Sequence, residues 1–337
     1  MKKKHLSLKD LASELKVSIS TVSRALKNHP DISPEMTKKV QALARKRNYT
    51  PNPLAMGLLR QQTKMIGVIV PDMVTQFFSS IISGIEHVAK QRGYYIIISS
   101  SYDSFQKERE CVENLLQTRV EGIIMSLSSE TKNFPHLRPL IDRELPLVLF
   151  DRVALTDKVS SVVVNDREST RKIALHFYNQ GYRRIAFISG ASHLQMVKER
   201  ANGYWEAIRE VGLPEKKEYF VECNMTQQSA AQAMMKLLRL PEPPDAVCGV
   251  SHTATFGALK AIRNGGLTIP NEIAVAGFAD QFHAELVTPN LTSIHHPTFE
   301  IGREAARLFF ERLENPSEMP VQVVLNTQLV PRGSSLK

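Results

Sequence analysis

The chain has 337 residues, of which 42% are hydrophobic and 23% charged, a composition typical of a globular protein with two or three domains. Its three cysteines are too few and too scattered for a disulfide framework, and none forms a C-x-x-C pair. No apolar run approaches the roughly 20 residues of a membrane-spanning helix. Residues 1–62 carry thirteen Lys/Arg and four Asp/Glu, so their net charge of +9 equals that of the whole chain. The remaining residues therefore carry no net charge. The cationic segment predicts a polyanionic partner, nucleic acid.

No targeting segment is predicted at the start of the chain. The opening MKKKHLSLKD has basic residues but no apolar stretch behind them, which a secretory signal peptide would require. The few, scattered cysteines are typical of a reducing compartment. We therefore expect the protein in the cytoplasm, with no membrane partner.

The cationic segment predicts a helix-turn-helix. Apolar residues at helical spacing place one helix over 8–15 behind Ser7 as N-cap, and a second helix over 19–26 behind Ser18. A third helix is predicted after Ser33, with proline in its first helical position.

The outer face of the second helix has the side chains that suit a major groove. Ser20, Thr21 and Ser23 carry hydroxyls that can bond phosphates, and Arg24 can donate two parallel bonds to guanine. The alternative is a small three-helix bundle whose charges only keep it soluble. The concentration of positive charge favours the DNA-binding interpretation.

From Met65 onward, short apolar strands alternate with amphipathic helices. Strands are predicted at 65–70, 94–99, 122–126, 146–150, 161–164, 184–189, 219–222, 246–250 and 273–277. Helices are predicted at 77–91, 106–118, 132–142, 168–180, 197–211, 229–238 and 253–264. This alternation indicates two doubly wound parallel-sheet lobes, with a ligand cleft at the carboxyl ends of the strands.

No fingerprint of a catalyst is present in the body. There is no G-x-G-x-x-G after a strand, no G-x-x-x-x-G-K-[ST], no H-E-x-x-H and no G-x-S-x-G. His295-His296 is interpreted as part of a strand, because no third metal ligand lies at useful spacing. We therefore expect no enzyme, no cofactor and no metal site.

Motifs along the whole chain resemble the lac repressor (LacI/GalR) family. In the head they are Leu8-Lys9-Asp10-Leu11-Ala12, Val17-Ser18-Ile19-Ser20-Thr21-Val22-Ser23-Arg24-Ala25-Leu26 and Asn48-Tyr49-Thr50-Pro51-Asn52-Pro53-Leu54-Ala55. In the body they are residues 66–72, 120–124, 150–152, 181–188, 199–204, 275–278 and 288–292. The resemblance implies a helix-turn-helix head joined to a body similar to periplasmic sugar-binding proteins.

The resemblance also assigns DNA contacts. It implies base reading by Ile19, Ser20 and Arg24, and phosphate contacts by Ser18, Thr21 and Ser23. It further implies a hinge helix over 52–60 that forms on DNA between two protomers, with Leu58 inserted into the minor groove. Asn52 and Ala55 belong to the same implied contact surface.

The implied domain organisation follows from the same resemblance. The head covers 1–48, the hinge 49–62 and the effector-binding body 63–337. Within the body, the N-lobe covers about 63–164 and 295–324, and the C-lobe about 165–293 and 325–333. The chain would cross between the lobes near Val164, Ile294 and Leu325, and the N-lobe would form a homodimer. No heptad repeat is present after Val330, and the sequence does not distinguish a dimer from a tetramer.

An effector cleft is implied between the lobes. Its lining residues, by position in the family, are Asp72, Phe77, Asp103, Arg152, Asn165, Asp166, Arg200, His252 and Asp280. Carboxylates and arginines suit sugar hydroxyls, and an aromatic ring suits an apolar sugar face. For Asp72 and Asp103, a capping role is equally open.

Three departures from the family pattern bear on the effector. They are Ser251-His252 in place of Asn-Asp, Asn165-Asp166 in place of Asp-Asn, and Ala279-Asp280 in place of a pair of acids. A histidine in place of an acid removes a negative charge and can add a positive one. The effector is therefore hypothesised to be more acidic than a neutral sugar: a uronate, a sugar phosphate or another carboxylate.

The sequence as a whole predicts a ligand-responsive transcriptional regulator, most often a repressor in this family, that binds a near-palindromic DNA operator as a dimer. Two other classes stay open. A secreted solute-binding protein would share the body but lack the basic head. An α/β enzyme with an accessory DNA-binding head would need a nucleophile–base pair or a cofactor loop.

Overall fold

The computed structural model describes residues 7–47, 49 and 63–337. The predicted hinge helix, with Asn52, Ala55 and Leu58, lies outside the described residues. The chain divides into two compact units, Met1–Lys64 and Met65–Lys337. No helix in the described ranges is long and apolar enough to cross a membrane.

The first unit contains the three predicted helices. They are α1 (Leu8–Leu15), α2 (Ile19–Leu26) and α3 (Pro34–Lys46). The hydroxyls of Ser7, Ser18 and Ser33 each accept a bond from the backbone N–H three residues on, which satisfies donors that a helix start leaves open. A small apolar core joins the three helices, and it is formed by Leu11, Ala12, Val22, Ala25, Val40 and Ala44.

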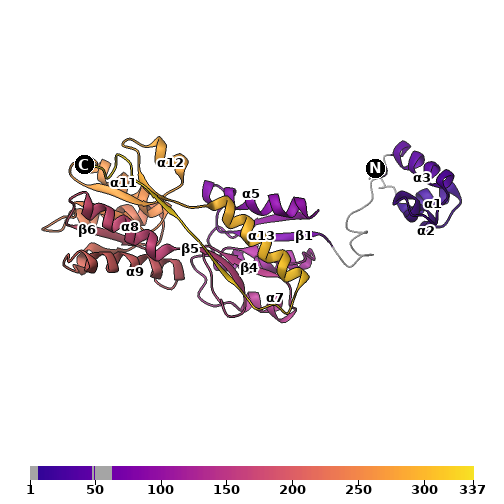
Figure 1. The fold of residues 1–337 in the computed structure, drawn as a ribbon, viewed down its shortest axis with the longest axis horizontal. Helices are drawn as coiled ribbons and strands as arrows, with labels where there is room; N and C mark the ends of the chain where they lie inside the picture. Colours follow the sequence, from indigo (N-terminus) through magenta and orange to yellow (C-terminus); the bar gives the residue numbers. More distant parts are fainter. Residues whose placement is uncertain (1–6, 48, 50–62) are drawn as a thin grey trace. The chain divides into compact units, whose positions relative to one another are not determined.

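The N-lobe of the second unit is built on a six-stranded parallel sheet. Its strand order is β11-β5-β4-β3-β1-β2. The strands are β1 (Met65–Val70), β2 (Tyr95–Ser100), β3 (Ile123–Met125), β4 (Leu147–Phe150), β5 (Ser160–Val164) and β11 (Gln322–Leu325). Helices α5 (Gln76–Gln91) and α13 (Thr298–Glu314) pack side by side into one apolar cluster with the sheet (Figure 1). Helix α6 (Phe105–Gln117) and the short elements η1 (Pro135–Leu137) and α7 (Arg138–Asp142) contribute to another.

The C-lobe repeats this architecture. Its sheet has the order β12-β10-β9-β8-β6-β7, in which only β12 is antiparallel to its neighbour. The strands are β6 (Ile185–Ser189), β7 (Phe220–Glu222), β8 (Ala246–Gly249), β9 (Ala274–Phe278), β10 (Thr292–His295) and β12 (Gln328–Val330). The helices are α8 (Asp166–Asn179), α9 (Gln195–Glu210), α10 (Gln227–Leu238), α11 (His252–Asn264) and the short α12 (Gln281–Leu286), with η2 (Lys217–Tyr219) before β7.

The chain passes between the two sheets three times: after β5, after β10 and after β11 (Figure 1). Asn165 ties two of these crossings together. Its amide donates to Asn326 Oδ1 at 3.2 Å, and its own Oδ1 accepts from the Thr327 backbone at 2.9 Å. The crossings bring the carboxyl ends of both parallel sheets to the same place, which is where ligands bind in α/β folds.

Two sequence predictions need correction. The helix predicted over 132–142 is an irregular segment followed by η1 and α7, because Pro135 has no N–H to donate and restricts the residue before it. No helix was predicted after Asn264, yet α12 and the 17-residue α13 lie there. Helix α13 has an apolar face at helical spacing, formed by Ile301, Ala305, Leu308 and Phe309, and this signal could have identified it.

Candidate functional site

The first candidate site is the outer face of α2. Ile19 is 48% exposed, and Ser20 and Arg24 are also exposed, whereas Thr21 and Ser23 are half-buried. Ser18 is exposed and is held as the N-cap, where its hydroxyl accepts from the Thr21 backbone N–H at 3.1 Å. Arg24 Nη1 lies 3.7 Å from Asp31 Oδ2 at the surface, a contact too weak to fix its position.

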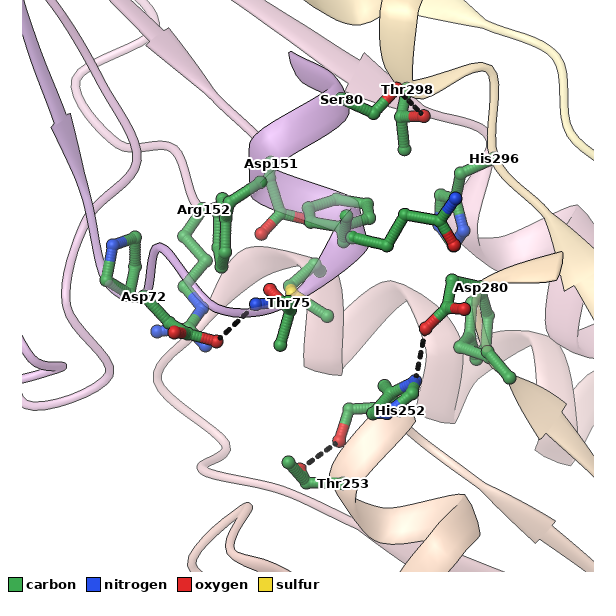
Figure 2. A pocket seen from close by; sticks show the side chains of 18 of the residues that line it. Asp72, Thr75, Ser80, Asp151, Arg152, His252, Thr253, Asp280, His296 and Thr298 are labelled. Carbon is green, nitrogen blue, oxygen red and sulfur yellow. Dashed lines mark hydrogen bonds and ion pairs between the residues drawn. The ribbon is translucent and has the colours of Figure 1, made fainter. Parts of the chain in front are cut away.

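The second candidate site is a cavity of about 400 Å³ between the lobes (Figure 2). It is bounded by the loops after β1, β2 and β4, by the starts of α5, α11 and α12, and by the crossing after β10. Seven of the nine predicted effector residues line it. They are Asp72, Phe77, Asp103, Arg152, Arg200, His252 and Asp280.

Arg152 is positioned by a carboxylate from the neighbouring loop. Its Nη1 donates to Asp103 Oδ1, and the same carboxylate accepts from the backbone and hydroxyl of Ser129 at 2.7 and 2.6 Å. Arg152 Nε is buried and has no hydrogen-bond partner within the described chain. An unpartnered buried donor is costly, so this nitrogen is suited to a ligand oxygen.

Arg200 is held from three sides. Its Nε donates to Asp166 Oδ1 at 2.6 Å, its Nη1 donates to the Val250 carbonyl at 2.6 Å, and its guanidinium lies 3.5 Å from the centre of the Phe278 ring. Burial raises the pKa of Asp166 to about 6 even though Arg200 opposes the shift. Asp166 therefore carries less than a full charge below that pH.

Asn165 and Asp166 lie outside the cavity lining. Asn165 joins the lobe crossings, as described above, and Asp166 is the buried partner of Arg200. Their place in the family pattern suggested ligand contact. In this structure the side chain of Asn165 is directed to the lobe crossing at Asn326 and Thr327, and that of Asp166 to Arg200.

Asp72 and Asp280 line the cavity and also accept backbone hydrogen bonds, Asp72 in the turn before α5 and Asp280 as a helix cap. Asp72 accepts from the backbone N–H groups of Val74 and Thr75 at 2.7 and 3.2 Å, at the start of α5. Asp280 is the N-cap of α12 and accepts from the His283 N–H at 2.9 Å. Asp72 also borders the cavity, so its role in effector binding stays a prediction.

His252 lies at the first position of α11 and faces Asp280 (Figure 2). Its Nδ1 is 3.2 Å from Asp280 Oδ2, and the His283 Nδ1 is 2.8 Å from Asp280 Oδ1. Burial lowers the pKa of His252 in spite of Asp280, so its imidazole is neutral near pH 7. The lowered pKa disfavours the positive charge that the sequence suggested for this residue.

Among the lining residues that the sequence did not predict as effector contacts are Asp151, His296 and Thr75. Asp151 is a positive-φ residue (φ 59) directly after β4, and burial raises its pKa against the opposing charges of Arg152 and Arg200. His296 packs edge-on against Phe77 at 5.4 Å between ring centres, and burial lowers its pKa to about 3. Its Nε2 and the Thr75 hydroxyl are buried without a partner in the described chain. Only the position of Asp151, just past a strand end, was a usable signal.

These features define a class of protein: a small helical DNA reader joined to a two-lobed α/β body with a polar and aromatic ligand cavity. Residues 7–52 match the family model "Bacterial regulatory proteins, lacI family", and residues 174–335 match "Periplasmic binding protein-like domain". The chain belongs to the lacI family of bacterial regulatory proteins and is a DNA-binding transcriptional regulator.

Similar proteins agree over the full length. The chain is 30% identical to the HTH-type transcriptional repressor CytR of Escherichia coli K12, over 98% of this chain and 96% of CytR. It is 32% identical to catabolite control protein A of Priestia megaterium, over 90% and 91% of the two chains. Among solved structures, a CelR–cellobiose complex matches with 26% identity and a TM-score of 0.72 over 98% and 99% of the chains. The fold is also that of the operator-bound lac repressor dimer, with a TM-score of 0.85 at 23% identity over 99% and 100%.

Proposed function

We propose that the protein is a repressor that binds a near-palindromic operator as a homodimer and responds to a small carbohydrate-type effector in the interlobe cavity. The observation that carries the proposal is the combination of an exposed recognition face on α2 with a cavity that contains unpartnered buried polar atoms. The effector would act through its different affinities for two lobe arrangements, a coupling of typically about 1–3 kcal/mol.

The recognition face of α2 supports the DNA part of the proposal. Ile19 and Ser20 are exposed in the first turn of α2, and Arg24 is exposed in its last turn. A helix of this kind places its N-terminal side chains against base edges, and two copies read two half-sites. Ser18, Thr21 and Ser23 are assigned to phosphates.

Selection of operator sites from random DNA followed by gel shift tests this assignment. Arg24→Ala should reduce affinity for the selected palindrome by about 1–3 kcal/mol while leaving binding to random DNA nearly unchanged. Lys39→Ala is a matched control, because Lys39 lies on α3 and pairs with Glu35 at 2.8 Å. An equal loss on selected and random DNA for Arg24→Ala would contradict base reading by this residue.

The charges of the cavity favour a neutral polyhydroxylated effector over the acidic one first considered. His252 supplies no positive charge near pH 7, and Arg152 and Arg200 are each paired with a carboxylate. Asp72, Asp151 and Asp280 add further carboxyl groups to the lining. Carboxylates accept bonds from sugar hydroxyls but repel an anion. The similar regulator CelR has been solved in complex with cellobiose, a neutral sugar, which agrees with this class of ligand.

Calorimetry can decide between the two effector classes. Neutral sugars and the matching uronic acids are titrated into the full chain, after a thermal-shift screen has identified a binder. We expect the neutral member of a pair to bind more tightly, and Arg152→Ala to weaken it at least tenfold, or about 1.4 kcal/mol. Arg109→Ala is the control, because Arg109 lies on the surface of α6. Tighter binding of the uronate would overturn this effector class.

A surface for the second copy is available at the edge of the N-lobe. Strand β2 is an edge strand, and Tyr95, Ile98 and Tyr102 in or just after it are 75%, 41% and 69% exposed. An open strand edge with large apolar side chains is costly to leave in water. We assign this β2 surface (Tyr95, Ile98 and Tyr102) to the homodimer.

A further inference from the structure

At the border of the cavity, three potential metal ligands meet around one carboxylate. They are His252, Asp280 and His283, each of which offers one ligand atom, and these atoms all lie within 4.8 Å of one another. Both imidazoles direct Nδ1 to Asp280, at 3.2 Å for His252 and 2.8 Å for His283. The spacing along the chain hides this set, because His252 begins α11 whereas Asp280 and His283 belong to α12.

Ring contacts hold the two imidazoles, and a capping bond to Oδ1 holds the carboxylate. His252 packs against the Phe256 ring at 4.5 Å between centres, and His283 against the Phe282 ring at 5.4 Å. The two imidazoles lie edge to face at 5.4 Å. Asp280 is oriented by its capping bond from the His283 backbone. The set is therefore largely preorganised, which is what a metal site needs.

We propose that His252, Asp280 and His283 bind one divalent transition-metal ion of the zinc, cobalt or nickel type. Two imidazole nitrogens and one carboxylate oxygen suit these ions, whereas magnesium and calcium prefer oxygen ligands alone. Ligand atoms of a tetrahedral zinc site lie about 3.4 Å apart, so the observed separations require only small side-chain rotations. When the ion is bound, each imidazole stays neutral with its proton on Nε2, and Nδ1 donates its lone pair to the ion in place of its contact with Asp280.

The site leaves a coordination position open. Only three protein ligands are present among the described residues, and such open sites keep a fourth position for water or a ligand atom. His252 and Asp280 line the cavity, while the His283 side chain is outside the lining and 48% exposed. The ion would add positive charge beside the carboxyl groups of the cavity.

Calorimetric titration of the full chain with zinc chloride and with cobalt chloride, after removal of chelator, tests the proposal. We expect one equivalent of metal per chain and a cobalt absorption spectrum typical of nitrogen and oxygen ligands. Loss of a residue that only supports a metal ligand typically weakens metal binding by roughly 10–100-fold. His283→Ala and Asp280→Asn each remove a ligand and should weaken binding by at least this much. His283 is exposed, and asparagine keeps the capping oxygen, so both variants should fold.

The control is His87→Ala, because His87 is an exposed histidine on α5 in the other lobe. It should bind metal as the unmodified chain does. Absence of saturable binding, or binding that His283→Ala and Asp280→Asn leave unchanged, would overturn the site and leave a purely hydrogen-bonded cluster. Either result is separate from operator binding through Arg24, which the gel shift measures without metal.

Discussion

His296 shows how one residue of the cavity can set the response of the body to acid. The imidazole lies between the rings of Phe77 and Phe278, at 5.4 and 5.5 Å between centres. Burial and the nearby charge of Arg200 lower its pKa from 6.5 to about 3. The unfolded chain therefore binds a proton on this residue between those pH values and the folded chain does not, so stability falls as the pH falls below 6.5.

We predict that His296→Phe removes this part of the acid sensitivity. Each pH unit below 6.5 costs the folded state about 1.4 kcal/mol through His296, so the natural chain should lose about 2 kcal/mol at pH 5 that the variant keeps. Urea unfolding followed by the fluorescence of Trp205, the single tryptophan, measures the difference at pH 5 and pH 7. The raised pKa of Asp166 has the opposite effect on stability, but it is present in the unmodified chain and in the variant. It therefore cancels when the two are compared. An unchanged difference between the two pH values would contradict a buried, neutral His296.

At the scale of elements, the packing of α5 on α13 depends on two glycines. A Cβ atom on Gly302 would lie 2.0 Å from the carbonyl oxygen of Ile81, and one on Gly84 would lie 2.2 Å from that of Phe299. The helices can approach this closely because neither position has a side chain. This packing also positions the start of α13, where Thr298 borders the cavity.

We predict that Gly302→Ala destabilises the body by more than about 2 kcal/mol, although alanine is favoured over glycine in a helix by about 1 kcal/mol. The clash is with backbone, which cannot rotate away. Arg303→Ala, on the exposed side of the same helix, should change stability by no more than about 0.5 kcal/mol. Chemical unfolding of the two variants is the measurement, and equal stabilities would refute the close contact.

The elements themselves were largely predictable. Serine caps, helical spacing and strand alternation identified the three head helices and nearly every element up to α11, since these signals are local. The prediction of one helix over 132–142 is wrong because Pro135 interrupts it. Helix α13 is absent from the prediction although its apolar residues have helical spacing.

At the scale of the whole molecule, the proposed dimer depends on the β2 surface. We predict that the pair of substitutions Tyr95→Lys and Ile98→Lys produces a monomer in sedimentation experiments, because two charges would face each other across a desolvated contact. Operator affinity should fall by several kcal/mol, since a monomer grips only one half-site.

Met235→Lys is the control for this prediction, because Met235 is an exposed apolar residue on α10 of the C-lobe. It should remain dimeric. A double variant that also stays dimeric, with full operator affinity, would exclude the β2 surface as the interface.

The sequence by itself determined the domain organisation, a cationic helical head and a neutral α/β body. It also determined that acids, arginines and aromatic residues lie at strand ends. Of the nine effector residues predicted from their positions in the family, seven line the cavity. Only the tertiary structure decided which partners those residues have. It paired Asp166 with Arg200, placed Asn165 at the lobe crossing beside Asn326, and placed His283 beside His252 and Asp280. The physical reason is that capping and periodicity act within a few residues, whereas charge pairing depends on a sheet order that joins segments far apart along the chain.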